Sequence, residues 1–386
     1  MREKKIQAID LLLANTKKFV NNEIIPKALD WERKGNRIPT RVLEELGRLG
    51  FFGLLIDSKF GGSGLDITSY AKVTEILATG DCGVANLVNV SNSPVAMAIE
   101  RYGTDIQKSK YLSALAKGEK RGCFMLSESN SGSDASSIQT MGREAAGGYL
   151  INGRKKFVTG GDSASVALVA VKTDQSLGKK GISLFLIPRD SYEVDRLENK
   201  MGHKNVDTAD VVFRESFVQE GALLGKLGEG YSICLKLLNT GRIGVAAQGV
   251  GIALAAFQQA RSYALTRKTF GKNLIENQSI SFRLTDMATK ISGARQLTLL
   301  AANQADKGER SVAESSMAKI YASEIAEQVT SDAIQIFGGD GYLEETGVEK
   351  LYRDARVLSI YEGSNEIQRI VMSREIEKGW SPDHEN

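Results

Sequence analysis

Proline is scarce in this chain, and its distribution restricts the folds that the chain can adopt. The 386 residues include only five prolines, and none lies between residues 189 and 381. Because proline breaks helices, that interval can hold long uninterrupted ones. The runs GVGIALAAFQQARSYALTRK, SISFRLTDMATKISGARQLTLLAANQADKG and SVAESSMAKIYASEIAEQVTSDAIQIFGG are each long and helix-compatible. The sequence therefore predicts three or four long helices, joined by short Gly/Asn turns, in an antiparallel bundle over residues 229–386.

The two parts before the bundle differ in pattern. Residues 1–119 carry apolar residues at helical spacing, as in PTRVLEELGRLGFFGLL, and we expect an α-helical domain there. Residues 120–228 carry β-branched or aromatic runs such as SASVALVAVKT and GISLFLIPRD, and Asn152-Gly153 predicts a two-residue hairpin turn. We expect a β-sandwich or barrel in this middle part. Because no strand alternates with a helix, a doubly wound parallel sheet is disfavoured, and the fold class is α+β.

The charge balance and apolar content exclude several kinds of partner. With 50 basic and 47 acidic residues the formal charge is +3, so no global field recruits nucleic acid or an anionic membrane surface. No stretch approaches the ~18 apolar residues of a membrane-spanning helix. Glu3 and Asp10 argue against a secretory signal or a transit peptide. We expect a protein that is not secreted, either cytoplasmic as in bacteria or the mature form of an organellar matrix protein.

Cysteine and histidine are too few for the common metal and triad chemistries. Cys82, Cys123 and Cys234 are far apart and never form a C-x-x-C pair, which fits a reducing compartment and no disulfide or zinc framework. The two histidines are His203 and His384, so a Ser–His–Asp triad would need His203 alone, and we expect no metal site. If the protein performs acid–base chemistry, we expect a carboxylate to carry it.

The segment SIYEGSNEIQRI near the C-terminus offers such a carboxylate. Its second half predicts a helix whose buried face consists of Ile367, Ile370 and Val371. Glu366 lies in the first turn of that helix, where the helix dipole favours an acid. Glu362 lies outside this turn and gains less from the dipole, so helix electrostatics explain it only in part.

Three further segments are unusual, and each has an ordinary alternative. CFMLSESNSGSDASS gathers hydroxyl and backbone N–H groups that suit a flat heterocycle or a phosphate, although a solvated loop has the same composition. QIFGGDGYLEETGVEKLYRDAR begins with three glycines in four positions, as at a helix cap, a corner or a close approach to a ligand. RKTFGKNLIENQSI places cations and an aromatic at a helix end, as dipole partners or a phosphate clamp. No G-x-G-x-x-G follows a strand, and no Walker A motif occurs.

Together these segments resemble the flavin-dependent acyl-CoA dehydrogenase family, above all its short-chain, butyryl-type members. LSESNSGSD matches the first family signature and QIFGGDGYLEETGVEKLYRD the second, while RKTFGK, LNTGR and IYEGSNEIQR match in the family's order and spacing. The resemblance implies an N-terminal helical domain (1–119), a middle β domain (120–228) and a C-terminal four-helix bundle (229–386). It also implies a homotetramer arranged as a dimer of dimers.

The resemblance further implies an activity. Members bind FAD, oxidise the Cα–Cβ bond of an acyl-CoA and pass electrons to an electron-transferring flavoprotein. Glu362 matches the base that removes the α-proton, and its backbone N–H would bind the thioester oxygen together with a flavin ribityl hydroxyl. In the isovaleryl and long-chain branches the base comes from the position of Gly241, which carries no side chain here. The substrate-binding positions of the family match Ser133, Asn239, Arg242, Tyr361 and Gly363.

The cofactor contacts also follow from the resemblance. Ser127 would contact the pyrimidine edge of the flavin, and Thr159 would bind flavin N5. Further positions at the flavin match Phe124, Leu126, Gly132, Ser133, Phe157, Ser364 and Glu366. The contacts to the FAD pyrophosphate and adenine, made across a dimer interface, match Arg267, Phe270, Gln278, Gln335, Gly338 and Gly339.

A few positions depart from the family pattern, and two other functions stay open. Phe157 replaces the usual tryptophan beside the flavin. Ala85 stands where glutaryl-CoA dehydrogenases carry a glutarate-binding arginine, which disfavours a dicarboxylyl substrate. The sequence leaves the acyl chain length open between short and medium. The alternatives are an acyl-CoA oxidase and a non-catalytic scaffold that binds flavin or acyl-CoA, although a scaffold would not need Glu362.

Overall fold

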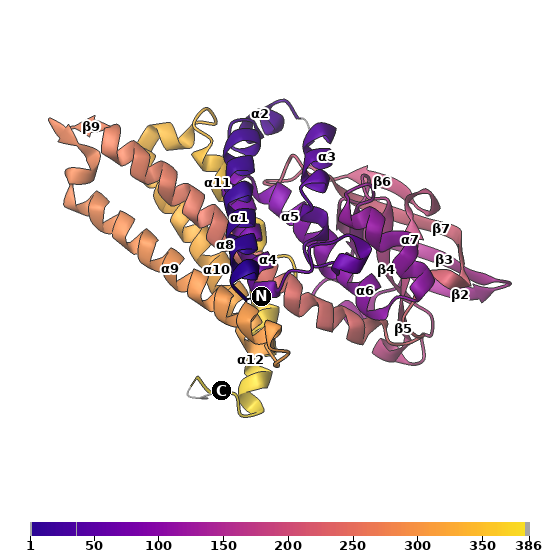
Figure 1. The fold of residues 1–386 in the computed structure, drawn as a ribbon. Helices are drawn as coiled ribbons and strands as arrows, with labels where there is room; N and C mark the ends of the chain where they lie inside the picture. The colour runs from indigo at the N-terminus through magenta and orange to yellow at the C-terminus, as the bar shows by residue number, and fades with distance from the viewer. Residues whose placement is uncertain (1, 36, 383–386) are drawn as a thin grey trace.

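The computed structural model describes residues 2–35 and 37–382, and it confirms the predicted helical, β and helical order (Figure 1). The strands of the middle part lie at one end of the molecule, at the right of the figure. The long C-terminal helices extend away from them to the left, and the first N-terminal helices lie between the two. The expected boundaries at 119/120 and 228/229 fall in the segments that connect these parts. His384 lies outside the described residues.

The N-terminal part is built from short helices with side-chain caps. Asp81 accepts a hydrogen bond from the backbone N–H of Val84 (2.9 Å), and Thr104 and Gln107 form a capping box. These caps stop the chain from continuing as one helix and let it fold around its own core. The helices are α1 (Arg2–Phe19), α2 (Ala28–Arg33), α3 (Thr40–Arg48), α4 (Ile67–Gly80), α5 (Cys82–Val90), α6 (Met97–Tyr102) and α7 (Asp105–Ala116).

The middle part is an eight-stranded sheet in the order β6-β7-β3-β2-β4-β5-β8, with β1 paired to β4. Most neighbouring strands are antiparallel, but β1 and β2 run parallel to β4. A local hydrophobic core fills its inner face. The strands are β1 (Gly122–Met125), β2 (Met141–Ala145), β3 (Gly148–Thr159), β4 (Val166–Lys172), β5 (Ile182–Pro188), β6 (Glu193–Leu197), β7 (Thr208–Gln219) and β8 (Leu223–Leu224).

The predicted hairpin turn at Asn152-Gly153 is wrong. Strand β3 runs through both residues, and the turn to β2 lies at 146–147. Gly153 has a φ of +149° and sits where the register with β7 shifts, which is the mark of a β-bulge. A Cβ at this position would lie 2.5 Å from the hydroxyl oxygen of Thr140. The glycine therefore permits a close approach inside a long, bent strand and does not reverse the chain.

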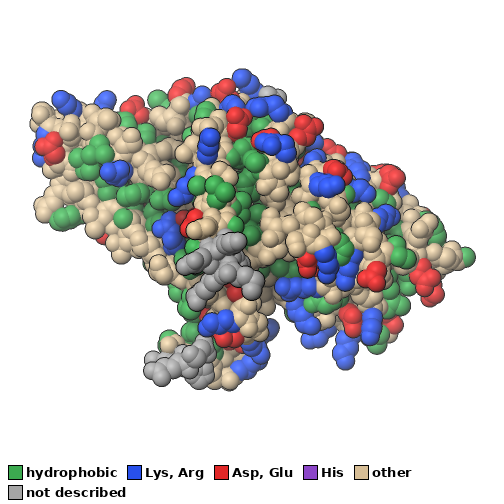
Figure 2. Space-filling view, viewed as in Figure 1, with side chains coloured by type: hydrophobic (Ala, Val, Ile, Leu, Met, Phe, Trp, Pro, Cys, Tyr) green, Lys and Arg blue, Asp and Glu red, His purple; other side chains and the backbone are tan. Residues whose placement is uncertain are grey.

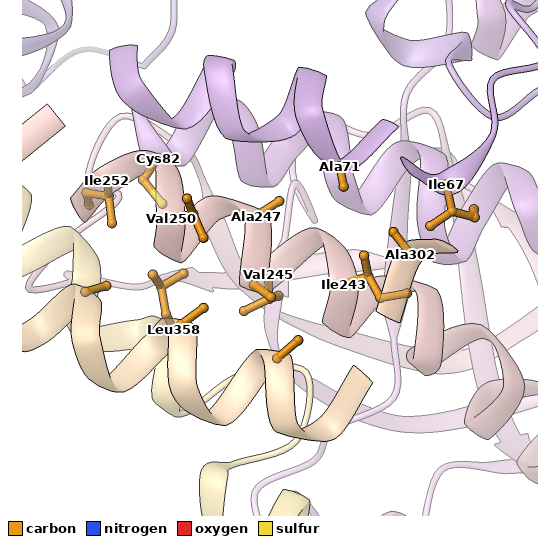
Figure 3. Packing of buried hydrophobic residues seen from close by; sticks show 14 of the residues in the cluster. Ile67, Ala71, Cys82, Ile243, Val245, Ala247, Val250, Ile252, Ala302 and Leu358 are labelled. Atoms are coloured by element: carbon orange, nitrogen blue, oxygen red, sulfur yellow. The ribbon is translucent and has the colours of Figure 1, made fainter. Parts of the chain in front are cut away.

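The C-terminal part contains the predicted bundle of long helices. Helix α8 has 37 residues and packs against α4, α9 and α10 through small apolar side chains such as Ala71, Val245 and Ala247 (Figure 3). The α8–α9 connection is a small β-hairpin (267–277), where a short turn was expected. The elements are α8 (Gly230–Thr266), β9 (Lys268–Thr269), β10 (Lys272–Asn273), α9 (Gln278–Asp306), α10 (Val312–Phe337), α11 (Val348–Ala355) and α12 (Asn365–Glu377).

Helix α8 is also long and apolar enough, by length and composition alone, to cross a membrane. Of its most apolar window, 78% is buried inside the protein. Its apolar surface is therefore used by the packing of the other helices, as in the central helix of a folded core.

A buried ion cluster joins the three parts close to the segment that precedes α12. The ammonium of Lys350 contacts carboxylates of Asp81 (2.8 Å), Asp354 and Glu32 (3.8 Å). Burial alone would lower the pKa of Lys350, but the carboxylates raise it well above its usual value. Asp354 also accepts a hydrogen bond from the backbone N–H of His203 (2.6 Å). These contacts connect α2 and α5, the loop before β7, and α11.

Candidate active site

Glu362 lies in a strained turn directly before α12. Its φ is +54°, in the left-handed region, and Gly363 follows with a φ of +86°. A non-glycine residue in a sparsely populated conformation costs on the order of 1–3 kcal/mol and persists only where its surroundings hold it. Such residues concentrate at functional sites, and the contacts around this turn show what holds it.

The carbonyl groups of the turn are held by side chains of α12 and α10. Gln368 donates to the backbone oxygens of Glu362 (3.3 Å) and Gly363 (3.0 Å). The Nζ atom of Lys319 also donates to the Gly363 oxygen (3.0 Å). Ser316 donates to the side-chain oxygen of Gln368 (3.1 Å), which fixes the orientation of that amide. The N–H of Glu362 has no intramolecular hydrogen bond within the described part of the chain, so it can donate to a ligand.

The predicted buried face of α12 is wrong. Ile370 is 45% exposed, and Ile367 and Val371 are only partly buried. The side chains buried near the start of the helix are Asn365 and Gln368, at 3% and 0% exposure. Helical periodicity pointed to the isoleucines, but hydrogen bonds to α10 decide which face turns inward. The inward face of α12 is polar because it supports the Glu362 turn.

The carboxylate of Glu362 is buried and poorly solvated. Its Oε2 atom is inaccessible to water and has no hydrogen-bond partner among the described residues. Burial raises the pKa of Glu362 to about 7, although the charges of Arg242 and Lys319 act to lower it. A Cβ at Gly241 would lie 2.7 Å from Oε2, so the glycine makes room for the carboxylate. A buried carboxylate with a pKa near neutrality is a candidate general base.

Lys319 is a site residue that sequence reasoning missed. It is fully buried, and its Nζ donates to Asn365 (2.8 Å) as well as to Gly363. Burial lowers the pKa of Lys319 to about 7, while Glu362 acts to raise it. One feature of the sequence could have indicated a buried, polar helix face at this position. Lys319 shares a helical face with Ser316 and Ser323, which are also buried.

The residues assigned to the flavin ring lie on two neighbouring segments of the β domain. Leu126 and Ser127 follow directly on β1, and the backbone N–H of Lys156 donates to the Ser127 oxygen (2.9 Å). This bond places Ser127 beside the part of β3 that carries Phe157 and Thr159. Phe124, Leu126, Ser127 and Thr159 are half-buried, whereas Gly132, Ser133 and Phe157 are exposed.

Lys155 is a second residue that sequence reasoning missed. It is 1% exposed, and its Nζ donates to the oxygens of Leu126 (3.1 Å) and Glu128 (2.7 Å). Burial lowers the pKa of Lys155 to about 8, against the opposing effect of Glu128. Glu128 also accepts from the backbone N–H groups of Gln139 and Thr140. The pair therefore fixes the segment that precedes Gly132 and Ser133.

The residues assigned to the FAD pyrophosphate and adenine lie at the other end of the bundle. Tyr263 stacks on Phe337 with 4.2 Å between ring centroids and donates to Asp340 (2.8 Å), so the end of α8 meets the glycine-rich turn after α10. Phe270 is 97% exposed at the hairpin tip, and Figure 2 shows other hydrophobic side chains exposed at this end. All six assigned residues are exposed: Arg267, Phe270, Gln278, Gln335, Gly338 and Gly339.

These two groups of cofactor residues are far apart within one chain. The hairpin at β9 lies at the end of the bundle away from the β domain (Figure 1). The remaining cofactor positions, Ser364 and Glu366, flank the start of α12, where Ser364 caps the helix by accepting from the backbone N–H of Ile367. One chain therefore does not bring all the assigned cofactor residues together.

The substrate positions form a compact group around Glu362. Arg242 is 4% exposed and donates to Asn239 (3.0 Å), while its Nε atom has no partner among the described residues. Burial lowers the pKa of Arg242. The hydroxyl of Tyr361 donates to Gln248 (2.6 Å), and the ring of His203 meets the Tyr361 ring edge-on at 6.3 Å. Ser133, also assigned to substrate, lies on the exposed β-domain loop.

The helical–β–helical order of the chain and its candidate acid–base site are typical of enzymes with the acyl-CoA dehydrogenase fold. Three family models cover the chain: the acyl-CoA dehydrogenase N-terminal domain at residues 7–119, the middle domain at 123–216 and the C-terminal domain at 228–377. The chain belongs to the acyl-CoA dehydrogenase family.

Individual relatives agree with this assignment. An acyl-CoA dehydrogenase of Bacillus subtilis is 39% identical over 358 residues, which are 92% of this chain and 94% of that protein. The CarC subunit of the caffeyl-CoA reductase-Etf complex of Acetobacterium woodii is 38% identical over 358 residues, with the same coverage. The structure of butyryl-CoA dehydrogenase from Megasphaera elsdenii superposes with a TM-score of 0.93 at 38% identity, over 96% of this chain and 98% of that one.

Family membership makes the protein an FAD-dependent oxidoreductase, and the residues present fit the cofactor. Gly132, Gly338 and Gly339 have no other heavy atom within 4 Å of the position that a Cβ would take, so their backbone is open to a ligand. Phe157 and Phe270 expose aromatic rings that a flavin or adenine could cover.

Proposed function

We propose that the protein dehydrogenates short- to medium-chain acyl-CoA thioesters to trans-2-enoyl-CoA, with Glu362 as the base that removes the α-proton. The main support is the state of Glu362: its Oε2 atom is buried without a hydrogen-bond partner among the described residues, and burial raises its pKa to about 7. A base with these properties stays unprotonated in part near neutral pH and is stronger than an exposed glutamate.

The reaction requires a proton acceptor, a hydrogen-bond donor to the thioester oxygen and a hydride acceptor, and residues of the chain fit the first two roles. The free Oε2 of Glu362 has a lone pair available for the α-proton. The free N–H of Glu362 can donate to the thioester oxygen, where negative charge develops. Arg242 and Lys319 favour the ionised form of the base. Bound FAD supplies the acceptor, at flavin N5, for the hydride that leaves the β-carbon. Asn239, Arg242, Tyr361 and Gly363 are proposed to position the substrate.

We further propose that the cofactor site is completed by a second copy of the chain. Ser127, Thr159, Phe157 and their neighbours would hold the flavin of one copy, while the exposed hairpin and glycine turn would hold the FAD pyrophosphate and adenine of its partner. The separation of the two groups in Figure 1 and the exposure of Phe270 support this arrangement. A homotetramer, as a dimer of dimers, is the proposed assembly, in the cytoplasm or an organellar matrix.

An electron-transferring flavoprotein is the proposed electron acceptor. The relative from Acetobacterium woodii is named as a subunit of a complex with such a protein. The same name supports a second candidate function, because that relative is called a reductase: this chain could add hydrogen to an enoyl-CoA. A pKa of about 7 leaves Glu362 partly protonated near neutrality, so the same group could return a proton to the α-carbon.

An anaerobic titration tests the proposal. FAD-loaded protein is mixed in turn with butyryl-, hexanoyl-, octanoyl- and isobutyryl-CoA, and the flavin absorbance is followed. Bleaching is the expected result, and the absence of bleaching with every acyl-CoA would reject dehydrogenation. Reoxidation of the bleached enzyme with crotonyl-CoA would favour the reductase direction if it is faster than bleaching. Peroxide formed in air at the rate of bleaching would instead indicate an oxidase.

A further inference from the structure

The side of α8 that faces Glu362 also contacts other polar side chains, some from α8 itself and some from α4 and α5. Gly241, Gly244 and Gln248 are three and four residues apart, so they line one face of the helix. Gly241 lies against the Glu362 carboxylate. Gly244 lies against the amide of Asn89 and the hydroxyl of Tyr70, so these groups stand about one helical turn beyond the base. Other parts of α8 pack through apolar side chains such as Val245 and Ala247 (Figure 3).

The polar groups on this face are buried and have unused hydrogen-bond donors. Asn89, Tyr70 and Gln248 are each 0% exposed. Tyr70 donates to the side-chain oxygen of Asn89, which leaves the Asn89 amide nitrogen without a partner. Gln248 accepts from Tyr361 (2.6 Å), and its amide nitrogen is also without a partner among the described residues. Two buried N–H₂ groups without a partner among the described residues therefore lie at the face of α8 that carries Gly241.

A buried hydrogen-bond donor without a partner lowers the stability of a protein, so the two unpaired amide nitrogens indicate a role in ligand binding. A buried donor without a partner costs about 1–3 kcal/mol, and folded proteins contain few of them. An ordinary alkyl chain would leave both amide nitrogens unpaired and would add no compensating contact. An acceptor oxygen on the ligand would satisfy them. The donors Asn89 and Gln248 thus favour an acceptor on the substrate.

We propose that this chain takes acyl-CoA substrates whose acyl group carries a hydrogen-bonding oxygen beyond the β-carbon, bound by the amide nitrogen of Asn89. The inference rests on the proposed function, since it assigns the acyl group of the substrate that Glu362 deprotonates. The acceptor is a neutral hydroxyl or carbonyl oxygen. The oxygen takes no part in the dehydrogenation, which removes one proton from the α-carbon and one hydride from the β-carbon.

A matched pair of substrates tests the proposal. Pentanoyl-CoA and 4-hydroxybutyryl-CoA have the same length and differ by a terminal methyl in place of a hydroxyl. With FAD-loaded protein, we expect anaerobic bleaching to give kcat/KM at least tenfold higher for the hydroxylated substrate, because a site built to bind an oxygen discriminates against its absence. Equal or higher kcat/KM for pentanoyl-CoA would overturn the inference and leave the proposed dehydrogenation intact. No bleaching with either one would instead reject both.

Variants locate the effect. Asn89→Leu keeps the number and branching of the side-chain heavy atoms and should lower the ratio of the two kcat/KM values at least tenfold. An unchanged ratio would overturn the assignment. Tyr70→Phe is the second variant, in case Asn89→Leu does not fold. It frees the Asn89 amide to rotate, and we expect a fall in the ratio of threefold or more. Gln304→Met, which removes a buried amide from α9, is the matched control and should leave the ratio unchanged.

Discussion

The turn that carries Glu362 and the hairpin that carries Phe270 belong to the same C-terminal bundle but are supported in opposite ways. The turn is held by Gln368 and Lys319 on its carbonyl groups. The hairpin tip exposes 97% of Phe270, and the nearby glycines Gly338 and Gly339 have open space around them. The turn is supported by hydrogen bonds within a single chain, whereas the hairpin exposes a side chain and backbone that a ligand or a second chain could contact.

This difference separates proposed proton abstraction, at the turn, from proposed FAD binding, at the hairpin. The groups that shift the pKa of the proposed base Glu362 include Arg242 and Lys319, which belong to the same chain. The proposed FAD contacts at the hairpin need a ligand and a second copy to become buried. Changes at the turn should therefore alter chemistry, while changes at the hairpin should alter cofactor retention and assembly. The following variants test that division.

Glu362→Gln should have the largest effect. Removing a general base costs about 10²–10⁴-fold in rate, so we expect bleaching by butyryl-CoA to slow by at least 10²-fold. Gln is close in size and needs no charge in the buried site, so FAD content and substrate binding should persist. Stopped-flow absorbance measures the rate, and the bound FAD is measured in the same sample. A variant that bleaches at the normal rate would remove Glu362 from the mechanism.

Lys319→Met should come second and should change the pH profile. The Gly363 oxygen keeps its bond from Gln368 but loses the charged donor. A hydrogen bond to a charged group contributes about 1.5–3 kcal/mol, so we expect kcat/KM to fall by about 10–100-fold. The ammonium of Lys319 acts to lower the pKa of Glu362. Since the base must be unprotonated, wild-type kcat/KM should rise with pH through about 7. Loss of the charge should move this rise to higher pH.

Lys319→Arg is the control for that shift, because arginine keeps its charge at every pH tested. The wild-type lysine has a pKa of about 7 and loses its charge above it. Below pH 7 the arginine variant should therefore follow the wild-type pH profile, and the methionine variant should depart from it. Identical pH profiles for the two variants would show that Lys319 acts through hydrogen bonds to Gly363 and Asn365 alone.

The sequence predicts features that depend on local residue patterns, but it does not predict contacts between residues that are distant in the chain. The order of helical and β parts was predictable, because the proline-free interval and the β-branched runs constrain it locally. The sequence singled out Glu362 as a candidate base through its position before the α12 helix and the family motif, and that role stays a prediction. Lys319 was not, because its partner Gly363 lies 44 residues away and only the packing of α10 on α12 joins them. The role of Lys155 in fixing Leu126 was missed for the same reason.

The wrong predictions share a physical cause. Ile370 was expected to be buried because hydrophobic periodicity normally decides which face of a helix turns inward. At α12 the hydrogen bonds of Asn365 and Gln368 decide it, and periodicity carries no information about them. Asn152-Gly153 was expected to reverse the chain because its residues suit a hairpin turn. A bulge also uses a glycine, and only the paired strand shows which of the two forms.

Phe270→Ser should act on the other region. Burying a phenylalanine side chain is worth about 1.5–3 kcal/mol, so loss of the ring should weaken FAD binding by about tenfold and shift the oligomer toward smaller species. The ring is exposed in the single chain, so the thermal stability of the protein without FAD should not change. FAD retention after gel filtration measures the first effect, and light scattering measures the second.

Phe217→Ser is the matched control for this variant. It removes another exposed ring, at 49% exposure on β7 of the middle part, away from the hairpin. FAD retention and oligomer size should stay at the wild-type values. Equal losses in both variants would mean that exposed rings stabilise the protein in general, and the proposed shared cofactor site would lose its support.

Phe157→Trp should have the smallest effect. Phe157 is 62% exposed on β3 and already has a φ of +59°, so tryptophan meets the same backbone and open space for its larger ring. Lys156 lies over the phenylalanine ring at 4.9 Å and can lie over an indole as well. We therefore expect the free energy of unfolding without FAD to stay within about 0.5 kcal/mol, measured by urea denaturation. A larger loss of unfolding free energy would show that other residues of the same chain pack against Phe157. Phe157 would then resemble the Glu362 turn, which its own chain supports without FAD.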